Sequence, residues 1–167
     1  GRELSKALDQ TKEFRIYAGR LARRLGNDTR LVEVLLDAFA GKDGILAGNH
    51  IRLRKIFDQE DLMAKVEGKL ADAGFNTELT SDEEHGLWEI DIAYPNGFSL
   101  KIDWNLASYV EFQKAVELKK ALEADFPGPF VLGENGTSEA IKTREELLEK
   151  VMGLAKKDLT IQRYKGL

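Results

Sequence analysis

The chain has 167 residues, of which 43% are hydrophobic and 32% are charged, and its formal net charge is −4. These values are ordinary for a globular protein with a sizeable core. The acidic balance argues against a general, non-specific DNA binder, because affinity for duplex DNA comes largely from neutralising phosphates.

The sequence contains no cysteine, so neither a disulfide framework nor a thiolate metal site is expected. No apolar run approaches the roughly 18 residues that a membrane span needs, and the N-terminus lacks a secretion signal. We therefore expect a cytoplasmic protein without membrane contact.

Charge is distributed unevenly along the chain. Residues 1–57 hold 12 Lys and Arg against 7 Asp and Glu, whereas residues 58–167 hold 13 against 22. Any contact with DNA is therefore expected at a local basic patch.

The N-terminal run predicts a long amphipathic helix over residues 2–25, with apolar side chains at spacings of three and four. Asp28 is the expected N-cap of a second helix, which Gly41 ends. On the first helix Arg20, Arg23 and Arg24 share one side. They form either a solvated helix face or a surface for phosphate or an acidic partner.

Residues 42–57 contain glycines in their first half and basic residues in their second half, a pattern that predicts a short strand or an extended linker. With the helical pair they make up a first segment, 1–57. His50 is expected at the surface, because a chain with two histidines and no cysteine offers few zinc ligands.

Asp58 is expected to open a third helix over about 59–73, which Gly74 ends. A strand from Phe75 then leads into an acidic turn, residues 81–86. The turn holds Asp82, Glu83, Glu84 and His85. A catalytic cluster is conceivable, but a solvated turn is favoured, since nothing nearby is apolar enough to shift a pKa.

The next two strands can be placed in register. A three-residue Pro95-Asn96-Gly97 loop, with Gly97 left-handed, keeps apolar side chains on one face. The resulting pairs are Tyr94 with Phe98, Ile92 with Leu100, Ile90 with Ile102, Trp88 with Trp104, and Asp91 with Lys101 on the other face.

Two capping boxes predict the remaining helices: Ser108 with Glu111 for a helix over 109–125, and Thr143 with Glu146 for one over 144–155. A short strand is expected at 130–132. The predicted fold is α+β, an N-terminal helical pair followed by a small, mainly antiparallel sheet packed with helices. Residues 58–158 form its α/β part.

The final segment, 159–167, reads LTIQRYKGL. Its apolar start predicts a strand, after which Arg163 and Lys165 bracket Tyr164 before a glycine. By composition this is either an edge strand with solvated cations or a phosphate contact. The run from Ile161 to Leu167 resembles the signature that closes the TOPRIM region in the B subunit of DNA gyrase, the ATPase subunit of type IIA topoisomerases.

In that family the motif continues into Gly-Glu-Met-Asn, just past Leu167, so the resemblance implies that the chain is part of a larger protein. The upstream residues then correspond in position and length to an insert within the TOPRIM region. The family's catalytic Glu-Gly-Asp-type and Asp-x-Asp motifs are absent, as are its ATP-binding motifs.

The resemblance therefore implies a non-catalytic segment with no catalytic residue, metal site or cofactor of its own, within an enzyme that uses ATP and magnesium. Its implied partners are DNA, the gyrase A subunit and the remainder of the gyrase B subunit. Arg163, Lys165 and Tyr164 are the first candidates for DNA contact, and Arg20, Arg23 and Arg24 the second. Two alternatives stay open: an interaction module in another protein, or the equivalent region of topoisomerase IV, where Phe more often replaces Tyr164.

Overall fold

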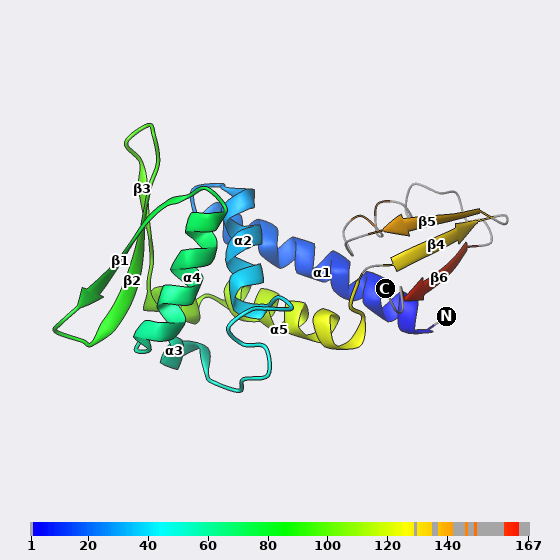
Figure 1. Cartoon of the computed structure of the whole chain (residues 1–167), viewed down its shortest axis with the longest axis horizontal. Helices are drawn as coiled ribbons and strands as arrows, with labels where there is room; N and C mark the ends of the chain where they lie inside the picture. The colour runs from blue at the N-terminus through cyan, green and yellow to red at the C-terminus, as the bar shows by residue number, and fades with distance from the viewer. Residues whose placement is uncertain are drawn as a thin grey trace. The chain divides into compact units, whose positions relative to one another are not determined.

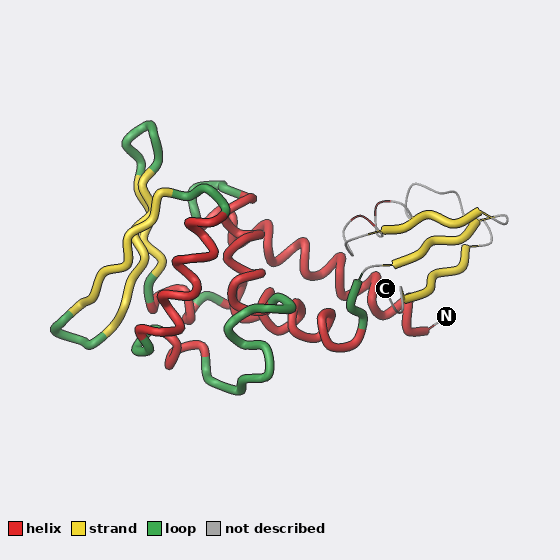
Figure 2. Tube along the Cα trace, in the orientation of Figure 1, coloured by secondary structure: helices red, strands yellow, loops and turns green. Residues whose placement is uncertain are grey.

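The computed structural model describes residues 2–128, 130–134, 137–141, 146, 149 and 159–163. A three-stranded antiparallel sheet lies beside helices, and a second such sheet follows in the sequence, so the α+β class is confirmed (Figures 1 and 2). The elements before the first sheet are α1 (Arg2–Arg24), α2 (Thr29–Ala40), α3 (Leu53–Ile56) and α4 (Glu60–Asp72). They are followed by β1 (Asn76–Asp82), β2 (Leu87–Ala93), β3 (Ser99–Ile102), the 3-10 helix η1 (Trp104–Ser108), α5 (Val110–Asp125), β4 (Phe130–Glu134), β5 (Thr137–Ile141) and β6 (Leu159–Arg163).

The chain divides into two units. We call Phe14–Lys120 the hairpin unit, and Gly1–Glu13 together with Ala121–Leu167 the terminal unit. The long helices α1 and α5 each contribute to both. Within the described ranges, no helix is long and apolar enough to cross a membrane.

The core of the hairpin unit is built around three aromatic rings. The ring of Phe39 lies 6.3 Å from that of Phe57 and 5.1 Å, edge to face, from that of Phe112. All three are fully buried, and they come from α2, the residue after α3, and α5. Aromatic burial thus joins elements that are distant in sequence.

The two N-terminal helices form as predicted. Asp28 Oδ1 accepts a hydrogen bond from the Leu31 amide at 2.9 Å, which caps α2, and Gly41 ends that helix. The intervening turn places Gly26 and Asn27 at positive φ, a conformation that both residue types tolerate.

The predicted strand or extended linker over 42–57 is wrong. Residues 41–48 form turns, and Leu53–Ile56 form the single helical turn α3. The alternating apolar residues do not pair in a ladder, because Ile56 and Phe57 turn inward and are completely buried. His50 is exposed, as expected.

The third predicted helix corresponds to α4, and Gly74 follows its end at φ +99°. Asp58 does not cap this helix, because its carboxylate accepts a hydrogen bond from the side-chain amide of Gln59 at 2.7 Å. The N-cap residue is Gln59, whose side chain makes no capping hydrogen bond. The buried side of α4 is formed by Met63, Val66 and Leu70. Helix α4 packs against β1 and β2, beside the sheet in Figure 1.

The first sheet has the predicted register from residue 90 to residue 102. Ile90 opposes Ile102, and Ile92 opposes Leu100. The Tyr94 amide donates to the Phe98 carbonyl at 2.8 Å, and Gly97 has φ +88° as the three-residue loop requires. Ile90, Ile92 and Ile102 are buried on the α4 side.

The Trp88–Trp104 pair is wrong. The ladder ends at Ile102, because the Asp103 carboxylate accepts from the Asn105 amide at 3.0 Å and turns the chain into η1. Trp104 is consequently 48% exposed rather than part of the buried face.

The capping box at the start of α5 does not form either. The Ser108 hydroxyl donates to the Asn105 carbonyl at 2.6 Å, as part of η1, and Glu111 pairs with Arg24. The helix nevertheless ends just before Pro127, as predicted.

In the terminal unit, β4 runs between β5 and β6 and is antiparallel to both. The strands expected near 130–132 and from 159 are confirmed as β4 and β6, whereas β5 was not predicted. The predicted strands therefore divide between two sheets rather than one. The helix expected over 144–155 lies outside the described residues except for Glu146 and Glu149, which are helical.

Candidate nucleic-acid interface

The first half of the C-terminal motif lies on β6. This strand pairs with β4 so that Leu159 opposes Glu134 and Arg163 opposes Phe130. The strand predicted from the apolar residues Leu159 and Ile161 is therefore present. Tyr164 and Lys165, the other two primary candidates, lie outside the described residues.

The second candidate, the arginine cluster on α1, is divided by the fold. Arg24 Nε lies 2.6 Å from Glu111 Oε2 on α5, and its guanidinium lies 4.4 Å from the centre of the Tyr109 ring. Arg24 therefore ties α1 to α5. Arg20 lies 5.4 Å from the ring centre of Tyr17, and both Arg20 and Arg23 are exposed. These two cations remain available to an outside group.

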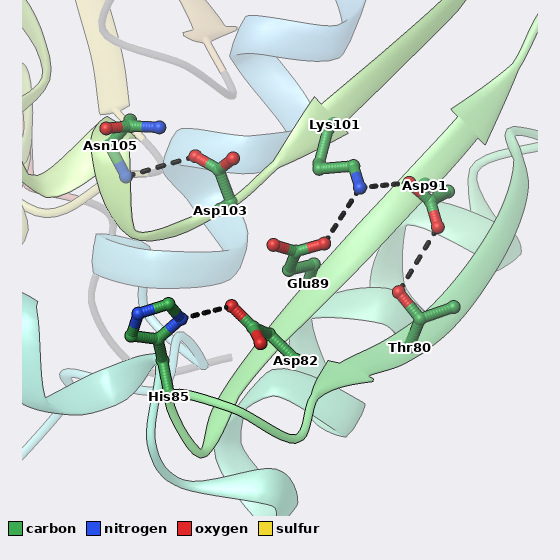
Figure 3. Close-up of polar contacts among 8 residues, drawn as sticks. All are labelled: Thr80, Asp82, His85, Glu89, Asp91, Lys101, Asp103 and Asn105. Atoms are coloured by element: carbon green, nitrogen blue, oxygen red, sulfur yellow. Dashed lines mark hydrogen bonds and ion pairs between the residues drawn. The ribbon is translucent and has the colours of Figure 1, made fainter.

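The turn between β1 and β2 gathers ionisable groups (Figure 3). Asp82 Oδ2 lies 2.8 Å from His85 Nδ1, and Asp82 Oδ1 accepts from the Glu84 amide at 3.1 Å. The hydrogen bond with His85 is the main cause that lowers the pKa of the Asp82 carboxyl, while burial acts in the opposite direction. Ligand atoms of Asp82, Glu84 and His85 lie within 4.8 Å of one another, so they could reach a cation. Glu84 and His85 are exposed, as the prediction of a solvated turn expects.

The face of the first sheet that alternates away from the buried isoleucines is acidic. Lys101 Nζ lies 2.9 Å from Glu89 and 3.7 Å from Asp91, and the Thr80 hydroxyl donates to Asp91 at 3.2 Å (Figure 3). The pKa of Lys101 is raised, first by the hydrogen bond with Glu89 and then by the charge of Asp91. One cation among several carboxylates gives this face a negative field, which would repel DNA.

A shallow groove of about 560 Å³ lies between the loop at residues 43–49 and α4. Its lining carries charges of both signs, Asp43 and Asp72 against Lys65 and Lys69. The lining holds no histidine, cysteine or hydroxyl side chain.

Comparison with known proteins gives no family: no family model matches the sequence, and no curated protein matches it either. The resemblance to the gyrase B subunit therefore rests on the seven residues from Ile161 to Leu167 and on the position and length of what precedes them.

Proposed function

We propose that this chain is a non-catalytic insert in the TOPRIM region of a DNA gyrase B subunit, assisting ATP-dependent supercoiling by contacting DNA, the gyrase A subunit or neighbouring parts of its own subunit. The observation that supports it is the run Ile161-Gln162-Arg163-Tyr164-Lys165-Gly166-Leu167. A run of seven specified residues is far less common by chance than a basic and aromatic composition alone.

Two further features agree with a supporting role. The sequence lacks the acidic motifs that hold magnesium in the TOPRIM region of the family, and it lacks the ATP-binding motifs. ATP and magnesium then belong to the rest of the parent enzyme. The acidic outer face of the first sheet limits DNA contact to other surfaces.

In this proposal Arg163 and Lys165 neutralise phosphate near the cleaved DNA or support groups that do, and Tyr164 lies between them. The strand β6 delivers Arg163 at its end. A position at the end of a paired strand suits this role, since phosphate contacts fix the position of a protein on DNA.

The sequence of the parent gene beyond Leu167 tests the proposal. A continuation as Gly-Glu-Met-Asn supports it. A stop codon or unrelated residues would show that the chain is an interaction module that shares a short motif, and the proposal would then be abandoned.

A further inference from the structure

The groove between the loop at residues 43–49 and α4 has a volume of about 560 Å³, which lies within the range of small-molecule sites. Both of its walls belong to the hairpin unit. Its apolar lining includes Ile45 and Ala47 from the loop and Leu62 from α4. Its charged lining consists of Asp43, Lys65, Lys69 and Asp72. A ligand in this groove would meet an aliphatic surface and charges of both signs.

Gly68 keeps the α4 side of the groove open. It lies in the interior of a 13-residue helix, where glycine is less favourable than alanine. A Cβ atom added at Gly68 would meet nothing within 4 Å, so no neighbouring group in the described structure requires its absence. Because Gly68 lines the groove, a longer side chain at this position would take up part of the space that a ligand needs.

The four charged side chains of the groove do not neutralise one another. Lys69 and Asp72 lie three positions apart on α4, a spacing at which helical side chains can pair. In the part of the chain that the structure describes, neither of them forms an ion pair, and neither do Asp43 and Lys65. Two cations and two anions therefore border one space. The ligand that complements them carries a positive and a negative group and has no net charge.

We propose that this groove binds a small zwitterion with an aliphatic side chain, of the class of the aliphatic amino acids. The carboxylate of the ligand pairs with Lys65 and Lys69, and its ammonium group pairs with Asp43 and Asp72. Its side chain covers the apolar part of the lining. This inference goes beyond the role proposed for the C-terminal motif and does not depend on it.

Other ligands fit the lining less well. Inorganic phosphate would match the two lysines but would face two carboxylates of its own sign. A polyamine would match the two aspartates but would be repelled by the lysines. A nucleotide would find no aromatic ring among the lining residues on which its base could stack. The combination of both charges with an aliphatic surface favours the zwitterion.

The test compares L-leucine with two relatives that each lack one of its charges, isopentylamine and isocaproate. Each compound is titrated into the isotope-labelled 167-residue chain, and the amide chemical shifts of residues 43–49 and of α4 are followed by NMR. Inorganic phosphate is a further probe. We expect leucine to shift these amides in a saturable manner, with a Kd in the millimolar range that suits an open groove. It should bind at least fivefold more tightly than either relative.

Variants of the groove make the test specific. Gly68→Leu should weaken the binding of leucine at least fivefold, because it fills part of the groove. Its matched control is Gly19→Leu on α1, at another helical glycine where an added Cβ would meet nothing within 4 Å, and this variant should bind as the parent does. Lys65→Gln combined with Lys69→Gln should weaken leucine and isocaproate but not isopentylamine. Thermal melts confirm that each variant is folded.

Three results would overturn the proposal: no saturable shift with leucine, equal binding of leucine and either relative, or unchanged binding of leucine by Gly68→Leu. Saturation by inorganic phosphate without a response to leucine would make the groove an anion site and overturn it as well. None of these results bears on the proposed function, which the gene sequence beyond Leu167 decides.

Discussion

Asp28 performs two structural tasks with one carboxylate. Its Oδ1 caps α2 through the Leu31 amide, and its Oδ2 accepts a hydrogen bond of 2.7 Å from the Tyr94 hydroxyl. The second contact joins the start of α2 to the end of the first sheet, across 66 positions of sequence. The side chain therefore couples two elements that no local pattern connects.

Replacement of this carboxylate should reveal both tasks. Asp28→Ala should lower the free energy of unfolding by about 1 to 3 kcal/mol, since it removes a cap and the partner of a half-buried hydroxyl. Asp28→Asn keeps a capping side chain and should cost less. Denaturant unfolding of the two variants checks this, and equal losses would show that the cap contributes nothing.

The environment of Tyr94 predicts a pH effect. Burial of the phenol raises its pKa, and the hydrogen bond to Asp28 and the charge of that carboxylate raise it further. Because the folded-state pKa lies above the ordinary tyrosine value of 10.0, the associated stability is complete below pH 10 and declines as the pH rises above it.

Titration of tyrosinate absorbance should detect this. The phenol of Tyr94 should stay protonated in the folded protein after the pH has passed about 10, and that late step should be missing in Tyr94→Phe. Stability should also fall less steeply above pH 10 in the variant. If Tyr94→Phe instead removes a phenol that ionises at an ordinary pH, the hydrogen bond between Tyr94 and Asp28 does not persist in solution.

Along the last strand of the first sheet, the alternation of apolar residues continues further than their burial does. Ile102 is 1% exposed at the end of the ladder, whereas Trp104, two positions later, is 48% exposed. The period of two continues through Trp104, but the cap at Asp103 ends the strand. The larger side chain therefore contributes less to the core.

This difference predicts an inverted order of mutational effects. Ile102→Ala should lower the free energy of unfolding by about 2 to 5 kcal/mol, because it leaves a cavity against the buried face. Trp104→Ala should lower it distinctly less, since about half of the surface of this residue is already in water. Chemical denaturation of both variants is the measurement, and a greater loss for Trp104→Ala would mean that the tryptophan joins the buried face after all.

Much of the fold was predictable from local chemistry. The caps at Asp28 and Gly41, the stop at Gly74 and the turn at Gly97 depend on short-range geometry, which the sequence states directly. The predictions failed where two interactions competed for the same side chain. The Ser108 hydroxyl bonds within η1 instead of capping α5, and Glu111 is drawn to Arg24, 87 residues away.

The candidate site was less predictable for the same reason. Helical spacing placed three arginines on one side of α1. It could not show that Arg24 pairs with a carboxylate from α5, whereas Arg20 and Arg23 pair with none in the part of the chain that the structure describes. Sequence identified the residue types, and the fold determined their availability.

For the whole molecule, the net charge of −4 limits interaction with duplex DNA. The isolated chain should bind duplex weakly, and the slope of log affinity against log salt should be shallow, at roughly 0.9 per neutralised phosphate. Binding measured over a range of salt concentrations checks this. Tight binding with a steep slope would reveal a larger cationic surface than α1 and the C-terminal motif supply.

The role proposed for the C-terminal motif is in DNA passage by a larger ATP-dependent enzyme. Its most direct test places Arg163→Ala and Lys165→Ala in the full parent subunit, reconstituted with the gyrase A subunit. DNA cleavage, supercoiling and DNA-independent ATP hydrolysis are then measured on the same preparation. We expect each variant to lose DNA cleavage and supercoiling while its ATP hydrolysis stays nearly unchanged, because the cations act on DNA and not on the nucleotide. Supercoiling at the level of the unmodified enzyme would contradict the claim and make these cations part of an ordinary solvated strand.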